Sequence, residues 1–344
     1  SAKRNPPGLT RGWGCWYGEI SNCPFILYTR VRRVERKNVD TSVPDLHDTR
    51  RYHLHHPVDL MTEFTVCESL GSPRSPTLRA LGLARTYGAR LGDRLRDRGL
   101  LWKGCRICEI GGGYGSLMRG LLEAHGDLVR RVLMVDLSRF LIDIQRKAME
   151  PWKERVSVIL ADALEVLPAL SGIDLFIINE MIGDLPVRTG LDPKRLPADA
   201  EAVVARFGLA VPREGPFHVN IGAIRLVEAI CRKSAPAFLS EHSSDPIIPR
   251  EMPFLAKGLE ATGWPREIRL TAHSEYTIRF SHLEQVARAF GRKVETGSLL
   301  EWVGYANAEK ARFVFNARAC STDEQALILE FLDHIREYRW MIIR

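Results

Sequence analysis

Short apolar runs alternate with helix-like segments in the middle of the chain. The apolar runs lie at residues 106–110, 132–135, 156–160 and 173–178, and helical spacing appears at residues 116–125 and 138–149. Strands that alternate with helices at this spacing form parallel βαβ units, so the pattern predicts a doubly wound α/β sheet. Because the runs are apolar throughout, we expect helices on both faces of the sheet.

The flanking regions have weaker patterns. Residues 1–75 show poor periodicity, and we expect them to form an N-terminal extension before one α/β domain at 76–344. A polar, proline-bearing insertion is expected at about 184–216, with one short helix at 199–207. The other expected elements are helices at 76–98, 222–233, 281–290 and 322–338, strands at 236–239 and 267–271, and strands over 293–317 with a turn at 305–309.

Composition and charge exclude several classes of protein. The 344 residues are 45% hydrophobic and 26% charged, which is ordinary for a globular chain. No apolar run approaches the ~18–20 residues of a membrane span, and the first residues contain no hydrophobic signal core. The net charge of +7 hints at an acidic partner. The arginine-rich stretches at 30–36 and 85–98 lack a nucleic-acid recognition motif, and the second mixes Asp with Arg as a solvated helix face does, so we expect no specific nucleic-acid partner.

The cysteine pattern favours a reducing compartment. Seven cysteines are scattered along the chain without a framework of pairs, at positions 15, 23, 67, 105, 108, 231 and 320. Cys105 and Cys108 form a CxxC motif inside an apolar run, and we interpret them as buried thiols of a strand. A metal site would need a second pair of ligands. None stands out, so we expect no metal.

A glycine-rich loop follows the first strand of the alternating region. Glycines let the backbone approach a ligand closely, and the helix that follows offers free N–H groups. A dinucleotide fingerprint would need glycine at the sixth position, which is Ser116, so an NAD enzyme is disfavoured. The loop, Glu109-x-Gly111-x-Gly113-x-Gly115, is instead similar to the acid-plus-three-glycines loop of class I S-adenosylmethionine (SAM) methyltransferases.

Polar residues end the next strands, and each suits one part of that cofactor. In this class the acid after the second strand, here Asp136 followed by Leu137, accepts the ribose hydroxyls. Asp162 and Ala163 would lie at the adenine edge. Asn179 would lie near the reactive methyl group, and Glu109 near the amino group or the loop amides. The alternative is that these residues are simple strand ends or helix caps.

Four segments resemble the MidA-like methyltransferase family, which includes the mitochondrial complex I assembly methyltransferase. Residues 177–187, IINEMIGDLPV, resemble the family's NExxDALPV segment, and ICEIGGGYGSL resembles its glycine loop. Residues 270–291 and, more faintly, 63–69 are similar to two further family segments. The first 55 residues do not match, and Ser240-Glu241-His242 stands where the family has Asp-Tyr-Gly.

The resemblance implies a SAM-dependent methyltransferase whose product is S-adenosylhomocysteine. The best-understood members of the family methylate an arginine of a complex I subunit. Carboxylates orient a guanidinium and help it to lose a proton, so Glu180 and Asp184 are the candidate catalytic residues. His273 and Glu275 are candidates for substrate binding. The alternative interpretation of Asp184 and Glu180 is a cap and a binder of backbone amides.

Two other functions share the same cofactor residues. One is a small-molecule O- or N-methyltransferase, and the other is an assembly factor that binds SAM without turnover. We expect a bacterial cytoplasmic protein, with the mitochondrial matrix as the alternative for a eukaryotic one.

Overall fold

The computed structural model describes residues 45–60, 63–317 and 320–344. All described residues belong to the second of the two units into which the chain divides, Val43–Arg344. The predictions for Cys15, Cys23 and the arginine-rich stretch 30–36 lie outside the described residues. Residues 45–75 are part of the second unit, so the domain boundary expected at residue 76 falls inside it.

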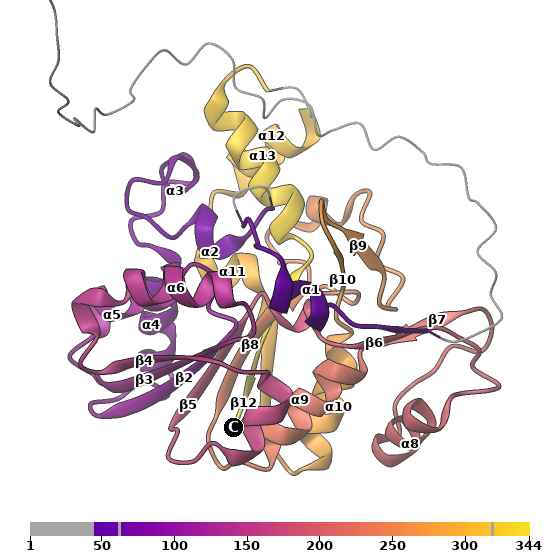
Figure 1. The fold of residues 1–344 in the computed structure, drawn as a ribbon. Helices are drawn as coiled ribbons and strands as arrows, with labels where there is room; N and C mark the ends of the chain where they lie inside the picture. Colours follow the sequence, from indigo (N-terminus) through magenta and orange to yellow (C-terminus); the bar gives the residue numbers. More distant parts are fainter. Residues whose placement is uncertain (1–44, 61–62, 318–319) are drawn as a thin grey trace, which may run out of the picture. The chain divides into compact units, whose positions relative to one another are not determined.

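A seven-stranded sheet forms the centre of this unit (Figure 1), in the order β11-β12-β8-β5-β2-β3-β4. Strands β8, β5, β2, β3 and β4 are parallel, whereas β12 runs antiparallel to both of its neighbours. This arrangement confirms the mostly parallel α/β sheet. The strands are β2 (Cys105–Ile110), β3 (Val129–Asp136), β4 (Val156–Leu160), β5 (Leu175–Asn179), β8 (Ala237–His242), β11 (Val294–Ser298) and β12 (Tyr338–Ile343).

Helices cover both faces of the sheet, as the apolar strands predict. One core includes side chains of α4 (Tyr87–Asp97), α5 (Ser116–His125) and α11 (Leu299–Val303), and the other includes side chains of α9 (Ile221–Cys231) and α10 (Phe280–Ala289). Because successive strand residues face opposite sides, Cys105 packs in the first core and Cys108 in the second. Both are fully buried free thiols, which confirms the interpretation of the CxxC motif.

Smaller elements surround the sheet. Strands β1 (Asp45–His47), β6 (Val187–Leu191) and β7 (Phe217–Val219) form a second sheet, and β9 (Glu267–Arg269) and β10 (Ser274–Tyr276) form a hairpin. The short helix expected in the insertion is α8 (Ala198–Phe207). The other helices are α1 (Arg50–His55), α2 (Val66–Ser69), α3 (Pro76–Ala80), α6 (Arg139–Ala148), α7 (Ala163–Val166), α12 (Ala308–Ala317) and α13 (Asp323–Ile335). None of the helices in the described part of the chain is long and apolar enough to cross a membrane.

Two expected helical or strand regions are wrong in detail. The helix expected at 76–98 is split into α3 and α4, because Gly82 adopts a positive φ of 66° and the Thr86 side chain caps a new helix by accepting from the Ala89 N–H. The strands expected over 293–317 reduce to β11, and α11 and α12 follow it.

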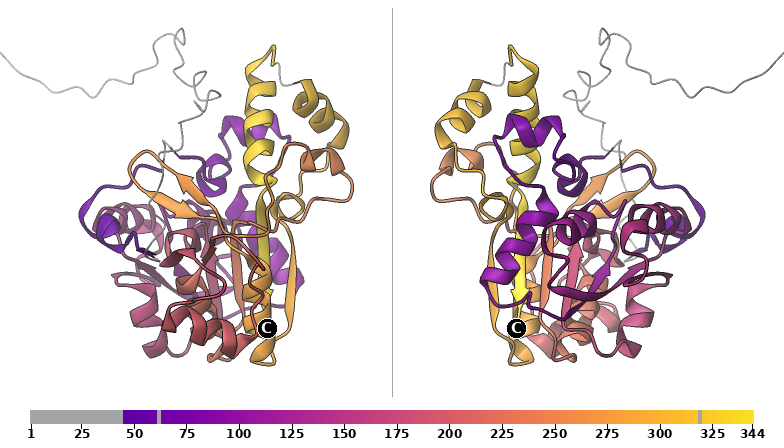
Figure 2. Two further views of the ribbon diagram at one scale, coloured as in Figure 1. Left: turned by 90° about the vertical axis from the view of Figure 1, so that its right-hand side faces the viewer. Right: turned by 90° about the vertical axis from the view of Figure 1, so that its left-hand side faces the viewer.

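The C-terminus departs most from the prediction. The helix expected at 322–338 ends at Ile335, and the chain then turns into β12, which inserts between β8 and β11. All six residues of β12 are buried. Tyr338 pairs with His242 at the end of β8, so α13 meets the sheet at the carboxyl edge of the parallel strands (Figure 2).

Candidate active site

A cavity lies at the carboxyl ends of the parallel strands, where open α/β sheets bind their ligands. It is walled by the segments that follow β2, β3, β4, β5 and β8, and by α1 and the β9–β10 hairpin. Gly115 does not line it but ends the loop before α5. The expected site residues that do line it are Glu109, Gly111, Gly113, Asp136, Leu137, Asp162, Ala163, Asn179, Glu180, Asp184, His273 and Glu275.

The glycine loop brings bare backbone to the cavity. Gly111 and Gly113 have positive φ angles of 71° and 52°, a conformation that side chains disfavour. A Cβ atom on Gly111 would lie 2.5 Å from Cβ of Met181. The loop therefore needs glycine at Gly111 both for its conformation and for its close approach to the segment after β5.

Glu109 lies beneath this loop with an unpartnered oxygen. The side chain is buried, and its Oε2 atom has no hydrogen-bond partner among the described residues. Burial, together with the neighbouring Asp136 carboxylate, raises the pKa of Glu109 to about 8. A buried carboxyl group without a partner is costly, and an ammonium group placed here would supply one.

Asp136 ends β3 and is held in a fixed orientation. Its Oδ1 accepts from the Ser138 N–H at 2.8 Å, and its Oδ2 accepts from Gln145 Nε2 at 2.7 Å. Gln145 also donates to the Gly113 carbonyl at 3.0 Å, which links the carboxylate to the glycine loop. Each carboxylate oxygen has two lone pairs, so Asp136 keeps the capacity to accept two ribose hydroxyls.

Asp162 caps helix α7 and also forms an ion pair with Arg50. It accepts from the Leu164 N–H at 2.7 Å and is the N-cap of α7, as the alternative interpretation has it. It also pairs with the Arg50 guanidinium of α1 at 2.8 Å, and Arg50 reaches Glu165 as well. The first turn of α1 is therefore fastened to the cavity wall beside Ala163.

Glu180 and Asn179 form a hydrogen-bonded hub at the end of β5. The Glu180 Oε1 atom accepts from the Val66 N–H and the Tyr338 hydroxyl, and Oε2 accepts from the Cys67 N–H and Asn179 Nδ2. These four donors use the four acceptor positions of a carboxylate. Glu180 is also the non-glycine residue with a positive φ, 52°, in the described chain. It holds α2 and β12 against the end of β5.

The Asn179 amide is equally engaged. Its oxygen accepts from the hydroxyls of Tyr87 and Ser240, and its nitrogen contacts Cys67 Sγ as well as Glu180. Asn179 therefore fixes the floor of the cavity through its side chain.

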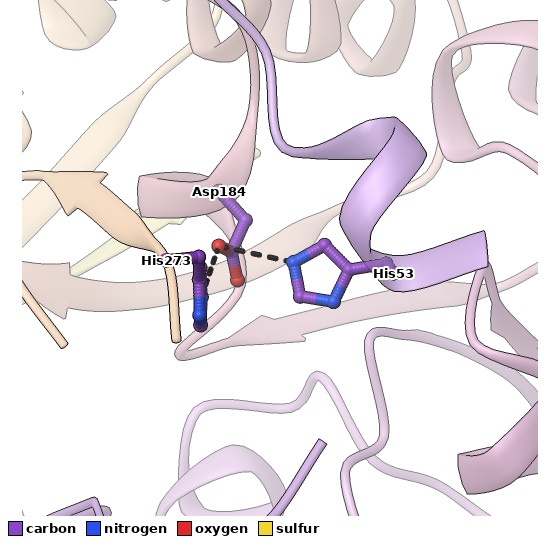
Figure 3. Close-up of side chains that lie close together, drawn as sticks. All are labelled: His53, Asp184 and His273. Carbon is purple, nitrogen blue, oxygen red and sulfur yellow. Dashed lines mark ion pairs between the residues drawn. The ribbon is translucent and has the colours of Figure 1, made fainter. Parts of the chain in front are cut away.

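Asp184 lies between two histidines (Figure 3). Its Oδ1 atom is 3.2 Å from Nε2 of His53, which comes from α1, and 3.2 Å from Nε2 of His273, which precedes β10. Burial would raise the pKa of Asp184, but the contacts with His273 and His53 dominate and hold it well below its usual range.

Two further carboxylates lie close to this group. Glu241 accepts from the Gly183 N–H at 3.2 Å, and a Cβ atom on Gly183 would lie 3.4 Å from Glu275 Oε2. Burial raises the pKa of Glu241 to about 7, and burial with the neighbouring Glu241 carboxylate raises the pKa of Glu275 well above its usual value. The cavity thus has a glycine-loop end and an acidic end.

Some residues of the acidic end have no counterpart in the prediction. Glu241 is the last residue but one of the buried strand β8, at the same edge as Asp136, so a search for acids near strand ends could have found it. His53 and Glu63 lie in the region that lacks periodicity, so no local signal points to them. Tyr338 was hidden by the incorrect extension of the last helix.

The comparisons with known proteins agree with this geometry. Residues 92–195 match a family model described as "Putative S-adenosyl-L-methionine-dependent methyltransferase". This region runs from α4 through β2, β3, β4 and β5 and includes every predicted cofactor residue. No curated protein matches the sequence.

Two solved structures from Burkholderia thailandensis share the fold. One is an uncharacterized protein, and the other is a "likely methyl transferase" bound to S-adenosyl-homocysteine. Each is 17% identical over 87% of this chain and 87% of its own, with a TM-score of 0.51. The fold is that of the class I SAM-dependent methyltransferases. The family model and the fold together support an enzyme that uses SAM.

The residues that line the cavity also fit SAM, independently of the similarity to known proteins. The unpartnered Glu109 oxygen suits the ammonium group, and the glycine loop leaves room for the methionine part. Asp136 retains acceptor capacity for the ribose. Asp162 and Ala163 line the far wall, where the adenine would lie.

Proposed function

We propose that the protein transfers the methyl group of SAM to a nitrogen acceptor, and that this acceptor is an arginine of a protein. The acidic end of the cavity supports the proposal. Asp184, Glu241 and Glu275 converge around Gly183, and Glu63 also lines this end. Buried carboxylates without an equal number of cations favour a cationic ligand, and the guanidinium group matches them in charge and hydrogen-bond geometry.

The acids also suit the proton balance of the reaction. SAM supplies a methyl group on a positively charged sulfur, and transfer forms an N–CH3 bond as the S–CH3 bond breaks. The attacking nitrogen must lose a proton. Glu241, whose pKa is raised to about 7 by burial, is matched to receive that proton near neutral pH. Asp184 stays ionised and orients the acceptor.

The proposal changes the expected role of Glu180. All four acceptor positions of its carboxylate are used by Val66, Cys67, Asn179 and Tyr338. We therefore assign Glu180 to positioning the cavity wall, and Asp184 with Glu275 to the acceptor. Glu109 and Asp136 hold the cofactor, with Leu137, Asp162 and Ala163 beside it.

The resemblance to MidA-like methyltransferases supports the choice of arginine. The matching residues Asn179, Glu180 and Asp184 lie at the junction between the two ends of the cavity. The departure at Ser240-Glu241-His242 places a carboxylate at this junction. A cytoplasmic bacterial location is our default proposal, and the mitochondrial matrix, which would fit the resembled family, is the alternative for a eukaryotic protein.

A methyl-transfer assay tests the proposal. The full chain is incubated with methyl-labelled SAM and a cell lysate, and the products are separated into protein and small molecules. We expect label in protein, released by hydrolysis as methylarginine. Label confined to small molecules would contradict the protein acceptor.

Calorimetry separates the remaining outcomes. If S-adenosylhomocysteine binds but no fraction is labelled, the assembly-factor function replaces the proposed one. If it does not bind at micromolar concentration, the proposed use of the cofactor is wrong.

A further inference from the structure

Three metal-ligating side chains from distant segments meet at the acidic end of the cavity. His53 lies on α1, Asp184 closes the turn after β5, and His273 precedes β10 (Figure 3). Their Nε2, Oδ1 and Nε2 atoms all lie within 4.8 Å of one another. The side chains are largely buried, with 14%, 24% and 6% of their surfaces exposed.

The contacts within the group do not use all of its polar atoms well. His53 Nε2 and Asp184 Oδ1 are paired at 3.2 Å, but the contact lacks the angles of a good hydrogen bond, and neither atom has another hydrogen-bond partner among the described residues. The second nitrogen of His273, Nδ1, is also buried without a hydrogen-bond partner in that part of the chain. Buried polar atoms without partners are rare and call for an explanation.

Two of the three atom pairs have the spacing of atoms bound to one ion, and the third pair, His53 with His273, lies within 4.8 Å. Two atoms 3.2 Å apart that each lie roughly 2.1 Å from an ion subtend an angle of about 100° at it. This angle falls between the octahedral and tetrahedral values. Both pairs, His53 with Asp184 and His273 with Asp184, have this same separation.

We propose that His53, Asp184 and His273 bind one divalent transition-metal ion at the acidic end of the cavity. Two imidazoles and a carboxylate favour ions such as Zn²⁺, Fe²⁺ or Co²⁺ over Mg²⁺ and Ca²⁺, which prefer oxygen ligands. The proposal goes beyond the methyl transfer and does not depend on it. It also reverses the expectation, drawn from the cysteines, that the chain holds no metal.

The ion would fasten α1 over the cavity. Arg50 already fixes the start of α1 to Asp162, and the ion would fix its other half, through His53, to the turn after β5 and to the β9–β10 hairpin. The Glu63 and Glu275 carboxylates line the same end and strengthen its attraction for a cation. With Glu241, three carboxyl groups line this end beside the three ligands, so the acidic end keeps groups that can pair with a cationic acceptor.

Titration with Co²⁺ tests the site directly. The full chain is freed of metal with a chelator and titrated with Co²⁺, and binding is followed by calorimetry and by visible absorption. We expect one ion per chain, an absorption spectrum typical of nitrogen and oxygen ligands, and a higher melting temperature than that of the metal-free chain. His53→Gln and His273→Gln should each weaken binding more than about 100-fold, beyond the loss caused by removing an outer hydrogen-bond partner.

His55→Gln is the matched control, because His55 is an exposed histidine of the same helix. It should bind Co²⁺ like the unaltered chain. Binding that is absent, that is equal in all variants, or that shows thiolate ligation would overturn the proposal and leave a plain histidine–carboxylate cluster. S-adenosylhomocysteine binding, measured on the same samples, shows that each variant is folded and reports on the proposed function separately.

Discussion

The two ends of the cavity are built in different ways. The glycine-loop end, here called the cofactor end, uses backbone and strand-end residues that follow one another in the sequence, from the glycine loop through Asp136 to Asp162. The acidic end is assembled from α1, the turn after β5, the end of β8 and the β9–β10 hairpin. A fold can keep the first end while the second changes, because only the second depends on contacts between distant segments. The variants below test first the junction of the two ends and then each end by itself.

The largest effect is expected at the junction of the two ends. Glu180→Gln would place an NH2 group against donors such as the Cys67 N–H and Asn179 Nδ2, which now face Oε2. Leaving buried donors unsatisfied costs about 1–3 kcal/mol each, so we expect the free energy of unfolding to fall by about 3 kcal/mol. Denaturant titration measures it. Glu123→Gln, an exposed change on α5, should leave the free energy of unfolding unchanged. Equal stability of the two variants would contradict the stabilising role of the Glu180 hydrogen bonds.

The second largest effect is expected on cofactor binding, at the cofactor end alone. Asp136→Ala removes the carboxylate proposed to accept the ribose hydroxyls. Hydrogen bonds to a charged group contribute about 1.5–3 kcal/mol, so we expect S-adenosylhomocysteine to bind about 100-fold more weakly in calorimetry. Asp143→Ala, an exposed change on α6, is the control. Unchanged affinity in the Asp136 variant would remove this residue from the cofactor site.

A substitution of Glu275 tests the acidic end by itself. Glu275→Gln keeps the shape of the side chain and removes the ionisable carboxyl group that lies near Gly183 and could pair with a bound cation. We expect kcat/KM for a basic acceptor to fall about tenfold, the loss of roughly 1.4 kcal/mol of transition-state binding, with cofactor affinity unchanged. Glu267→Gln on the neighbouring strand, outside the cavity lining, should leave both quantities as they are. A parallel loss of cofactor affinity would show that the two ends are not separate.

This difference also explains what could be predicted from the sequence. Glu109 and Asp136 lie at the ends of the apolar strands β2 and β3, and Asp162 comes shortly after β4, so the strand pattern alone places them at one edge of the sheet. His53 comes from a segment without periodicity and reaches the site only through the tertiary fold. The strand β12 was missed because the last expected helix extended to Tyr338 and no element was predicted after it, although six consecutive buried residues fit a strand between two others.

The smallest effect is a pH dependence that isolates one group of the cofactor end. The pKa of Glu109 is raised from 4.5 to about 8, so the folded chain holds a proton that the unfolded chain releases. Stability from this group is therefore full below about pH 4.5 and is lost as the pH rises through 8. An ammonium ligand needs the ionised form, so its affinity should rise about fivefold between pH 7 and pH 8.

Glu109→Gln separates this effect from the titration of the ligand's own amine. Calorimetry of S-adenosylhomocysteine at both pH values, in buffers of different ionisation enthalpy, should show proton release on binding to the unaltered chain at pH 7. The Gln variant should lack that release and lose the stability change between pH 5 and pH 8, because it has no carboxyl group to titrate. If both chains release the same number of protons, Glu109 does not meet the ammonium group, and its unpartnered oxygen then serves the glycine loop instead.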